Sequence, residues 1–236
     1  MENMRLVLLV GQSNMAGRGV PEPEDLIPIP GVYALNEAME FVPAIEPVTF
    51  DRPNLKGVSC GRTFAKLLYD LDPSTPVGLI PAAVGGTGTT AWKPGGQDTV
   101  SDKHPYDDAL EMVKIARQHG EIVAILWHQG ETDGKWKNEN YAADLTEIIN
   151  NFRRDLDLPE TPFICGELGH YLKDTVYDFA PVNEGIRQVT STLPHMGLVS
   201  AEGLTDKGDK LHFDTRSQHI FGERYFAEYC RVAGIK

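Results

Sequence analysis

The chain has 236 residues, and its 41% hydrophobic and 24% charged residues are typical of a globular protein with a core of its own. Its 22 basic and 34 acidic residues give a formal net charge of −12, which repels the phosphates of nucleic acids and the surface of anionic membranes. We therefore expect neither a nucleic acid nor a membrane as a partner.

The cysteines and the first residues of the chain indicate in which cellular compartment the protein is expected. Cys60, Cys165 and Cys230 are widely spaced and form no C-x-x-C pair, so they predict small core side chains rather than a disulfide framework or a zinc site. The first residues lead into a short apolar strand and not into a signal peptide, and no stretch has the length of a membrane span. These features predict a cytoplasmic protein of one domain, 1–236, and leave its oligomeric state open.

Short apolar runs alternate with longer segments of helical period along the chain. We expect strands at 6–10, 77–82, 123–128, 162–166 and 196–200, and helices at 61–70, 106–119, 141–156, 181–192 and 217–232. The strands are almost wholly apolar, as in a buried parallel sheet. This alternation predicts an α/β fold, a three-layer sandwich with a parallel central sheet that binds ligands at the carboxyl ends of its strands.

The segment between the first strand and the first helix is rich in proline and has no regular period. We expect residues 20–53 to form a long irregular excursion over the surface, of the kind that often lines a site. Ser59 is expected to cap the helix that follows.

The first strand ends in Gly11-Gln12-Ser13-Asn14, where polar residues replace the apolar residues of the core. A serine on such a turn can expose its hydroxyl as a nucleophile while its backbone N–H points at a bound oxygen. The alternative is that Ser13 is an ordinary helix cap. The second strand is followed by the glycine-rich turn 84–88, whose backbone amides can approach a ligand oxygen if it is more than a tight turn.

A polar cluster of His128, Gln129, Glu131 and Asp133 follows the third strand. The Gln129 amide can donate to a transient oxyanion without adding charge. Glu131 and Asp133 can also be solvated loop charges, and His128 is expected to pack in the core. A metal site on His128 and Glu131 stays open as an alternative, but no other histidine has a spacing that pairs with it, so we expect no metal and no cofactor.

Asp209 and His212 lie in the loop after the last strand. An aspartate three residues before a histidine can accept from its Nδ1–H and leave Nε2 facing outward as a base, although an exposed histidine is the plainer interpretation. Together with Ser13, separate strand ends then supply a nucleophile, oxyanion donors and an oriented base. A rival serine, Ser59 in the G-x-S-x-G segment 57–61, has no strand before it. The G-x-G-x-x-A segment 86–91 is not followed by the helix that a dinucleotide site needs.

These residues resemble a known family. Blocks 11–17, 85–87, 128–131 and 209–213 are similar to those of the SGNH hydrolases, and within them to the acetylesterases of the sixth carbohydrate-esterase family and the sialate O-acetylesterases. The resemblance spans nearly the whole chain and implies a flavodoxin-like parallel sheet. It also implies that Ser13 is the nucleophile, His212 the base, and Asp209 the residue that orients His212.

The resemblance further implies an oxyanion hole made by the backbone amides of Ser13 and Gly86 and by the side chain of Gln129. Many members of the superfamily have an asparagine where this chain has Gln129, so this assignment depends on the narrower subfamily. Glu131 and Asn14 are expected to support the site from behind.

We therefore predict a metal-independent serine esterase that removes acetyl groups from the hydroxyls of a saccharide such as acetylated xylan or sialic acid. Two alternatives are a carbohydrate-binding module on the same fold and a lipase-type or thioesterase enzyme. The first would not need Ser13 or His212. The second should have an apolar cleft, whereas Trp92, Trp136 and Tyr171 near polar loops suit the faces of sugars, unless they pack in the core.

Overall fold

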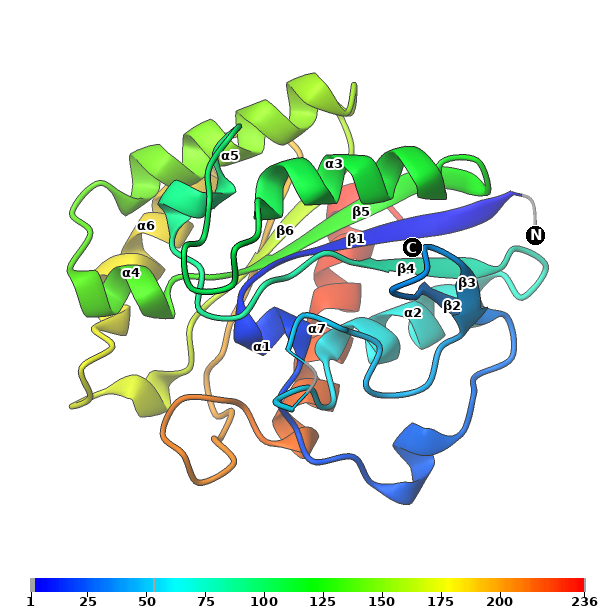
Figure 1. Ribbon diagram of the computed structural model, residues 1–236, viewed down its shortest axis with the longest axis horizontal. Coiled ribbons are helices and arrows are strands. Elements are labelled where there is room, and N and C mark those ends of the chain that lie inside the picture. Colours follow the sequence, from blue (N-terminus) through cyan, green and yellow to red (C-terminus); the bar gives the residue numbers. More distant parts are fainter. Residues whose placement is uncertain (1–2, 53, 236) are drawn as a thin grey trace.

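A seven-stranded sheet forms the centre of the protein in a computed structural model that describes residues 3–52 and 54–235 (Figure 1). Its strands are β1 (Met4–Gly11), β2 (Val32–Leu35), β3 (Phe41–Pro43), β4 (Val77–Pro81), β5 (Gly120–His128), β6 (Phe163–Gly166) and β7 (Met196–Val199). They lie in the order β3-β2-β4-β1-β5-β6-β7. The five strands expected from the sequence are all present and adjacent, in the flavodoxin-like order second, first, third, fourth, fifth.

The helices flank this sheet. The longer ones are α2 (Cys60–Leu71), α3 (Pro105–Ala116), α5 (Tyr141–Asp155), α6 (Phe179–Thr192) and α7 (Thr215–Ala233), and all five match predicted helices. The short ones are α1 (Ser13–Ala16), α4 (Glu131–Trp136) and the 3-10 turns η1 (Pro23–Leu26), η2 (Thr89–Trp92) and η3 (His170–Leu172). No helix among the described residues is long and apolar enough to cross a membrane.

Two hydrophobic cores lie on the two faces of the sheet, as the alternation of side chains along a strand requires. In β1, Leu6 and Leu8 join the core under α3, α5 and α6, whereas Val7 and Leu9 join the core under α2 and α7. Figure 1 shows α3 and α5 on one side of the sheet and α2 and α7 on the other. The expected three-layer α/β class is therefore confirmed, and β1 is buried on both faces.

The proline-rich segment 20–53 differs from the prediction of a wholly irregular excursion. It contains η1, β2 and β3; β2 pairs in parallel with β4, and β3 pairs antiparallel with β2 at the edge of the sheet. The sheet is therefore not entirely parallel. Both strands are very short and stand between prolines, so their pattern is too brief to reveal a period.

Candidate functional site

Ser13 lies where β1 passes into α1, at the carboxyl edge of the sheet. It is the first residue of α1, and its side chain lies beside a surface cleft although the residue is only 7% exposed. Backbone N–H groups in the first turn of a helix have no partner within that helix. Within residues 3–52 and 54–235, no acceptor is found for the Ser13 N–H, so this donor is available to a bound group.

His212 and Asp209 reach Ser13 from the loop between β7 and α7. Figure 1 shows this loop beside α1, although the two are far apart in sequence. The Ser13 hydroxyl lies 3.0 Å from Nε2 of His212, and Nδ1 of the same ring lies 2.7 Å from Oδ2 of Asp209. The other Asp209 oxygen accepts from the His212 backbone N–H at 2.8 Å, so one turn fixes both groups. The structure thus brings together the three side chains that the sequence proposed.

The electrostatics of Asp209 suit a carboxylate that stays charged. Partial burial by itself raises its pKa, but hydrogen bonds from the backbone and ring of His212 outweigh this effect. The pKa of Asp209 consequently lies below its ordinary value. An ionised Asp209 holds the Nδ1–H tautomer of His212 and leaves Nε2 free to accept the serine proton.

The glycine-rich turn after β4 forms the opposite wall. Gly86 has a φ of 85°, a conformation that residues with a side chain rarely adopt, and it lines the cleft beside Ser13. The neighbouring Gly85 N–H donates to Asp51, whose carboxylate also pairs with Arg18 at 2.8 Å. No acceptor for the Gly86 N–H is found in the described part of the chain, which leaves a second backbone donor facing the cleft.

Asn14 connects the two halves of the site. Its Oδ1 accepts from the Phe213 N–H at 3.0 Å, and its Nδ2 donates to the Leu211 carbonyl at 3.2 Å, so it holds the backbone on both sides of His212. Nδ2 also donates to the buried carboxylate of Glu131. Asn14 therefore links the buried Glu131 carboxylate to the backbone on both sides of His212.

Gln129 does not occupy the position expected of an oxyanion donor. It is fully buried, and its Nε2 donates to Asp133 at 2.6 Å, to the Thr87 carbonyl at 3.0 Å and to Gln12 at 3.3 Å. Asp133, expected as a possible solvated charge, is buried as well. The amide of Gln129 therefore belongs to this internal network.

Gln12 lines the cleft instead, which the sequence analysis missed. Its Oε1 accepts from Gln129, from the Gly130 N–H at 3.3 Å and from the Thr132 N–H at 3.4 Å. These bonds fix the oxygen of the Gln12 amide. Its Nε2 has no hydrogen-bond acceptor among the described residues and is available to a group bound in the cleft. The signal for this role in the sequence was the polar stretch Gln12-Ser13-Asn14, in which Gln12 directly precedes Ser13.

Other expected residues have structural positions. His128 is buried between Phe213 and Phe221, and burial lowers its pKa, so the prediction that it packs in the core is confirmed. Ser59 is buried at the start of α2, where its hydroxyl donates to Glu46 rather than capping the helix. Among the described residues, no strand lies between β3 and α2.

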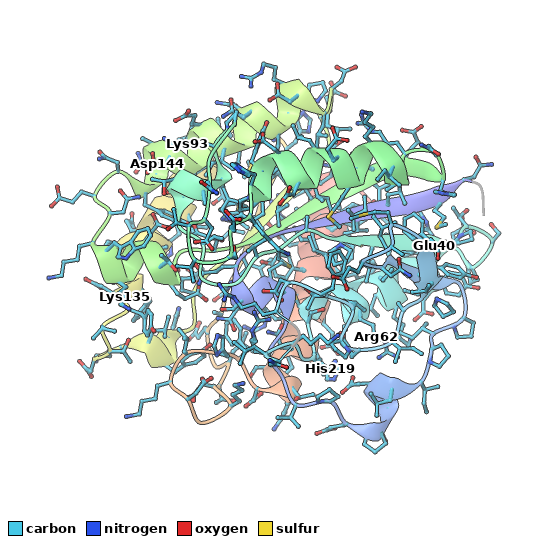
Figure 2. The ribbon with its side chains drawn as sticks, viewed as in Figure 1. Glu40, Arg62, Lys93, Lys135, Asp144 and His219 are labelled. Carbon is cyan, nitrogen blue, oxygen red and sulfur yellow. The ribbon has the colours of Figure 1, made fainter. Side chains whose placement is uncertain are left out.

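The cleft around Ser13 has a volume of about 370 Å³. Its charged walls come from Arg18, Arg52 and Lys135, the last on the outer side of α4 in Figure 2. Arg18 is neutralised by Asp51, whereas Arg52 and Lys135 form no ion pair within the described residues. The cleft beside Ser13 in this acidic protein is therefore lined by two cationic side chains that have no acidic partner among the described residues. Arg52 belongs to the segment 20–53, which the sequence analysis expected to line a site, whereas Lys135 was not singled out there.

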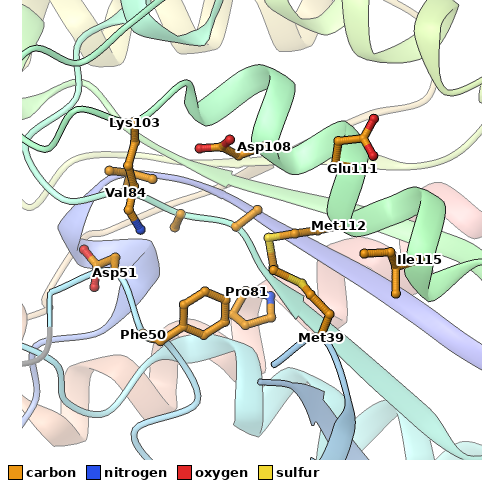
Figure 3. A pocket seen from close by; sticks show the side chains of 12 residues that line it. Met39, Phe50, Asp51, Pro81, Val84, Lys103, Asp108, Glu111, Met112 and Ile115 are labelled. Carbon is orange, nitrogen blue, oxygen red and sulfur yellow. The ribbon is translucent and has the colours of Figure 1, made fainter. Parts of the chain in front are cut away.

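A second cavity of about 210 Å³ lies on the other side of Val84 (Figure 3). Its floor is apolar, with Met39, Phe50 and Met112, and carboxylates of Asp108 and Glu111 lie at its rim. It contains neither a serine nor a histidine, so it offers no pair of nucleophile and base. Among these two cavities, the cleft of Ser13 is therefore the candidate active site.

Comparisons with known proteins show the family of the chain. The family described as "Carbohydrate esterase, sialic acid-specific acetylesterase" matches residues 3–231. A probable carbohydrate esterase of Arabidopsis thaliana is 30% identical over 254 residues, covering 96% of this chain and 92% of the relative. The X-ray structure of that plant protein has a TM-score of 0.85 at 29% identity and covers 97% of this chain and 98% of its own.

Two more distant structures share the fold. NanS has a TM-score of 0.77 at 15% identity, covering 100% of this chain and 99% of its own. A carbohydrate acetylesterase from Xanthomonas citri has a TM-score of 0.76 at 18% identity, covering 98% of this chain and 57% of its own. At these identities the likeness concerns the fold alone.

Proposed function

Because the chain belongs to the carbohydrate esterase family of sialic acid-specific acetylesterases, and is thus a carboxylic ester hydrolase, we propose that it removes O-acetyl groups from saccharides with Ser13 as its nucleophile. The observation that supports this most strongly is the continuous hydrogen-bonded series from Ser13 through His212 to Asp209 at the edge of the cleft. Each distance in it is within the range of a hydrogen bond.

In the first half of the reaction, Oγ of Ser13 attacks the acetyl carbonyl carbon while Nε2 of His212 takes the hydroxyl proton. The resulting tetrahedral intermediate collapses, and the bond between the acetyl carbon and the sugar oxygen breaks. His212 gives its proton to that oxygen, so the saccharide leaves as an alcohol and the acetyl group stays on Ser13. A water molecule then attacks the acetyl-enzyme with His212 again as base, and acetate leaves.

The oxyanion of each tetrahedral intermediate needs donors that are already in place. We assign the backbone N–H groups of Ser13 and Gly86, for which the described residues offer no acceptor, and the Nε2 of Gln12. This replaces the Gln129 donor that the resemblance implied. Gln129 then acts indirectly, because its amide holds the Gln12 oxygen.

The charges of the cleft favour an anionic saccharide such as sialic acid over neutral acetylated xylan. Arg52 and Lys135 line the same cleft as Ser13 and form no ion pair within the described residues, so either can meet a sugar carboxylate. Arg52 also donates to the Gly85 carbonyl, which holds it at the glycine-rich turn. A neutral xylan fragment would use neither cation. A lipase-type enzyme is disfavoured by the same charges, and a purely binding protein would not need the Ser13–His212 contact.

The test is acetate release from O-acetylated sialic acid, acetylated xylotriose and p-nitrophenyl esters of increasing acyl length. We expect the sialic acid ester to be hydrolysed with the highest kcat/KM, more slowly at high salt, and not at all by Ser13→Ala. Arg52→Gln and Lys135→Gln should raise KM for the sialic acid ester more than for xylotriose. A preference for long acyl chains, or full activity of Ser13→Ala, would contradict the proposal.

A further inference from the structure

Trp136 is an exposed tryptophan at the wall of the catalytic cleft. It ends α4 and is 62% exposed, whereas Trp92 and Trp127 are fully buried in the core, where they meet edge to face. Leu55 and Val100, also exposed, line the same cleft. Large apolar side chains that gather at a concave site usually mark a surface that a ligand covers.

The ring of Trp136 is held in place by the glycine-rich turn. A Cβ added to Gly88 would lie only 2.6 Å from Cζ3 of the tryptophan, so the six-membered ring rests directly on the backbone of the turn. That turn also contains Gly86, which faces Ser13. One part of the ring is thus supported by the wall that contributes an oxyanion donor, and the rest remains open to solvent and to the cleft.

We infer that Trp136 is the platform on which the sugar ring of the substrate stacks while its acetyl ester lies at Ser13. The apolar face of a pyranose presents C–H groups, which are attracted to the electron-rich face of an indole. Arg52 and Lys135 leave the polar edge of such a sugar with charged partners in the same cleft. This inference rests on the proposed function, because it assigns Trp136 to the saccharide part of the ester.

The other two candidates of the sequence analysis do not compete for this role. Trp92 is buried, and its Nε1 donates to Thr87. Tyr171 packs edge-on against Phe213 and donates to the Leu211 carbonyl, so it belongs to the support of the His212 loop. Trp136 is therefore the one of the three that a sugar can reach at the cleft.

A binding experiment tests the platform without any turnover. In the Ser13→Ala protein, acrylamide should quench mainly the fluorescence of Trp136, because the other two tryptophans are buried. We expect O-acetylated sialic acid or acetylated xylotriose to protect this fluorescence, and ethyl acetate not to protect it. Because Trp136 is the reporter, its role is checked by titration calorimetry, in which Ser13→Ala, Trp136→Ala should bind the same saccharide about tenfold more weakly than Ser13→Ala. Equal binding by the two proteins, or no protection of the Trp136 fluorescence by either saccharide, would overturn the inference.

A kinetic experiment tests the same role during hydrolysis. Trp136→Ala should lower the ratio of kcat/KM for the saccharide ester to kcat/KM for ethyl acetate by about tenfold, mainly through KM. Gly88→Ala should shift the ratio in the same direction, because the new methyl group displaces the ring. Val176→Ala, at another exposed apolar residue, is the matched control and should leave the ratio unchanged.

Equal losses on both esters in Trp136→Ala, or a selective loss on long-chain esters, would contradict a sugar platform. These outcomes are separate from those of the proposed function. If Ser13→Ala still releases acetate, the nucleophile is wrong, but the protection of Trp136 by a saccharide can still be measured.

Discussion

Two polar segments at the same edge of the sheet look alike in sequence and differ in burial. In the turn after β5, the side chains of Gln129, Glu131 and Asp133 are buried and bond to other internal groups. In the loop after β7, the side chains of Asp209 and His212 remain 35% and 18% exposed, and His212 faces Ser13 across the cleft.

Under the proposed function, this difference in burial separates the side chains that react with the ester from those that hold the site in position. A buried polar side chain with fixed partners cannot approach a substrate, but it can hold the backbone beside the site. A partly exposed pair can exchange protons with a bound ester and still be oriented by its neighbours. Polar side chains that follow a strand therefore hold the backbone after β5, whereas after β7 we propose that they take part in the reaction.

The largest effect should come from the exposed segment. Asp209→Asn leaves the geometry in place but removes the charge that selects the His212 tautomer, and we expect kcat to fall by about 10⁴ with little change in Tm. Asp206→Asn in the same loop is the control, because its side chain accepts only backbone N–H groups of Gly208 and Lys210 in the described structure. If Asp206→Asn or Glu131→Gln were the more damaging variant, the orienting acid would lie elsewhere.

Substitutions of Gln12 and Gln129 should have the next largest effects, and they distinguish the side chain that faces the cleft from the buried one. Gln12→Glu keeps an oxygen for the Gly130 and Thr132 N–H groups but loses the outward donor, so kcat should fall by about 10²–10³. Gln129→Met removes buried hydrogen bonds and should lower Tm more while retaining more of kcat. Measured kcat and Tm with the reverse pattern would restore Gln129 as the oxyanion donor.

Asn14→Ala should affect both catalysis and stability, since Asn14 lies between the two segments. Releasing the backbone beside His212 is expected to cost about 10²-fold in kcat. Leaving the Glu131 carboxylate without this donor should cost about 1–3 kcal/mol in the free energy of unfolding by urea. Asn36→Ala, far from the cleft, should leave kcat intact. A stable, fully active Asn14→Ala protein would show that the hydrogen bonds of Asn14 to the backbone beside His212 are unnecessary.

The smallest effect on catalysis should come from Glu46, a buried carboxylate outside the site. Burial raises its pKa to about 7, although hydrogen bonds from Ser59 and Val48 oppose this. Between the unfolded pKa and pH 7 the folded state holds the extra proton. The contribution of Glu46 to the free energy of unfolding is therefore fully present below the unfolded pKa. It falls by roughly 3 kcal/mol as the pH rises from there through the folded pKa of about 7.

Glu46→Gln should remove that slope from urea unfolding measured at pH 5 and pH 8, with kcat nearly unchanged. Glu40→Gln, at an exposed glutamate, serves as the control. An unaltered pH slope in Glu46→Gln would mean that Glu46 does not titrate in this range.

Much of the fold was predictable because its buried strands are continuous apolar runs. The strands at 77–82 and 123–128 correspond to β4 and β5, whose burial on both faces produces that pattern. The edge strands β2 and β3 were not predictable, because four and three residues between prolines give no period. Tertiary pairing with β4 makes β2 a strand, and no local signal reports such pairing.

The site was predictable where its geometry is local. Asp209 and His212 are three residues apart on one turn, so their contact follows from spacing. The choice between Gln12 and Gln129 depends on which amide faces the cleft, and this is set by packing against Asp133 and Thr87. Trp136 and the segment of Arg52 were candidates from the sequence, but which of the candidates reach the cleft is decided by the tertiary fold.

The central claim is that Ser13 is the nucleophile, and covalent labelling tests it most directly. The native enzyme is treated with an aryl organophosphonate, digested, and analysed by mass spectrometry for the modified serine. The structure predicts a single adduct on the peptide that contains Ser13, with none on Ser59, and a rate of labelling that falls sharply in Asp209→Asn. An adduct on Ser59, or labelling that Ser13→Ala leaves unchanged, would contradict the account.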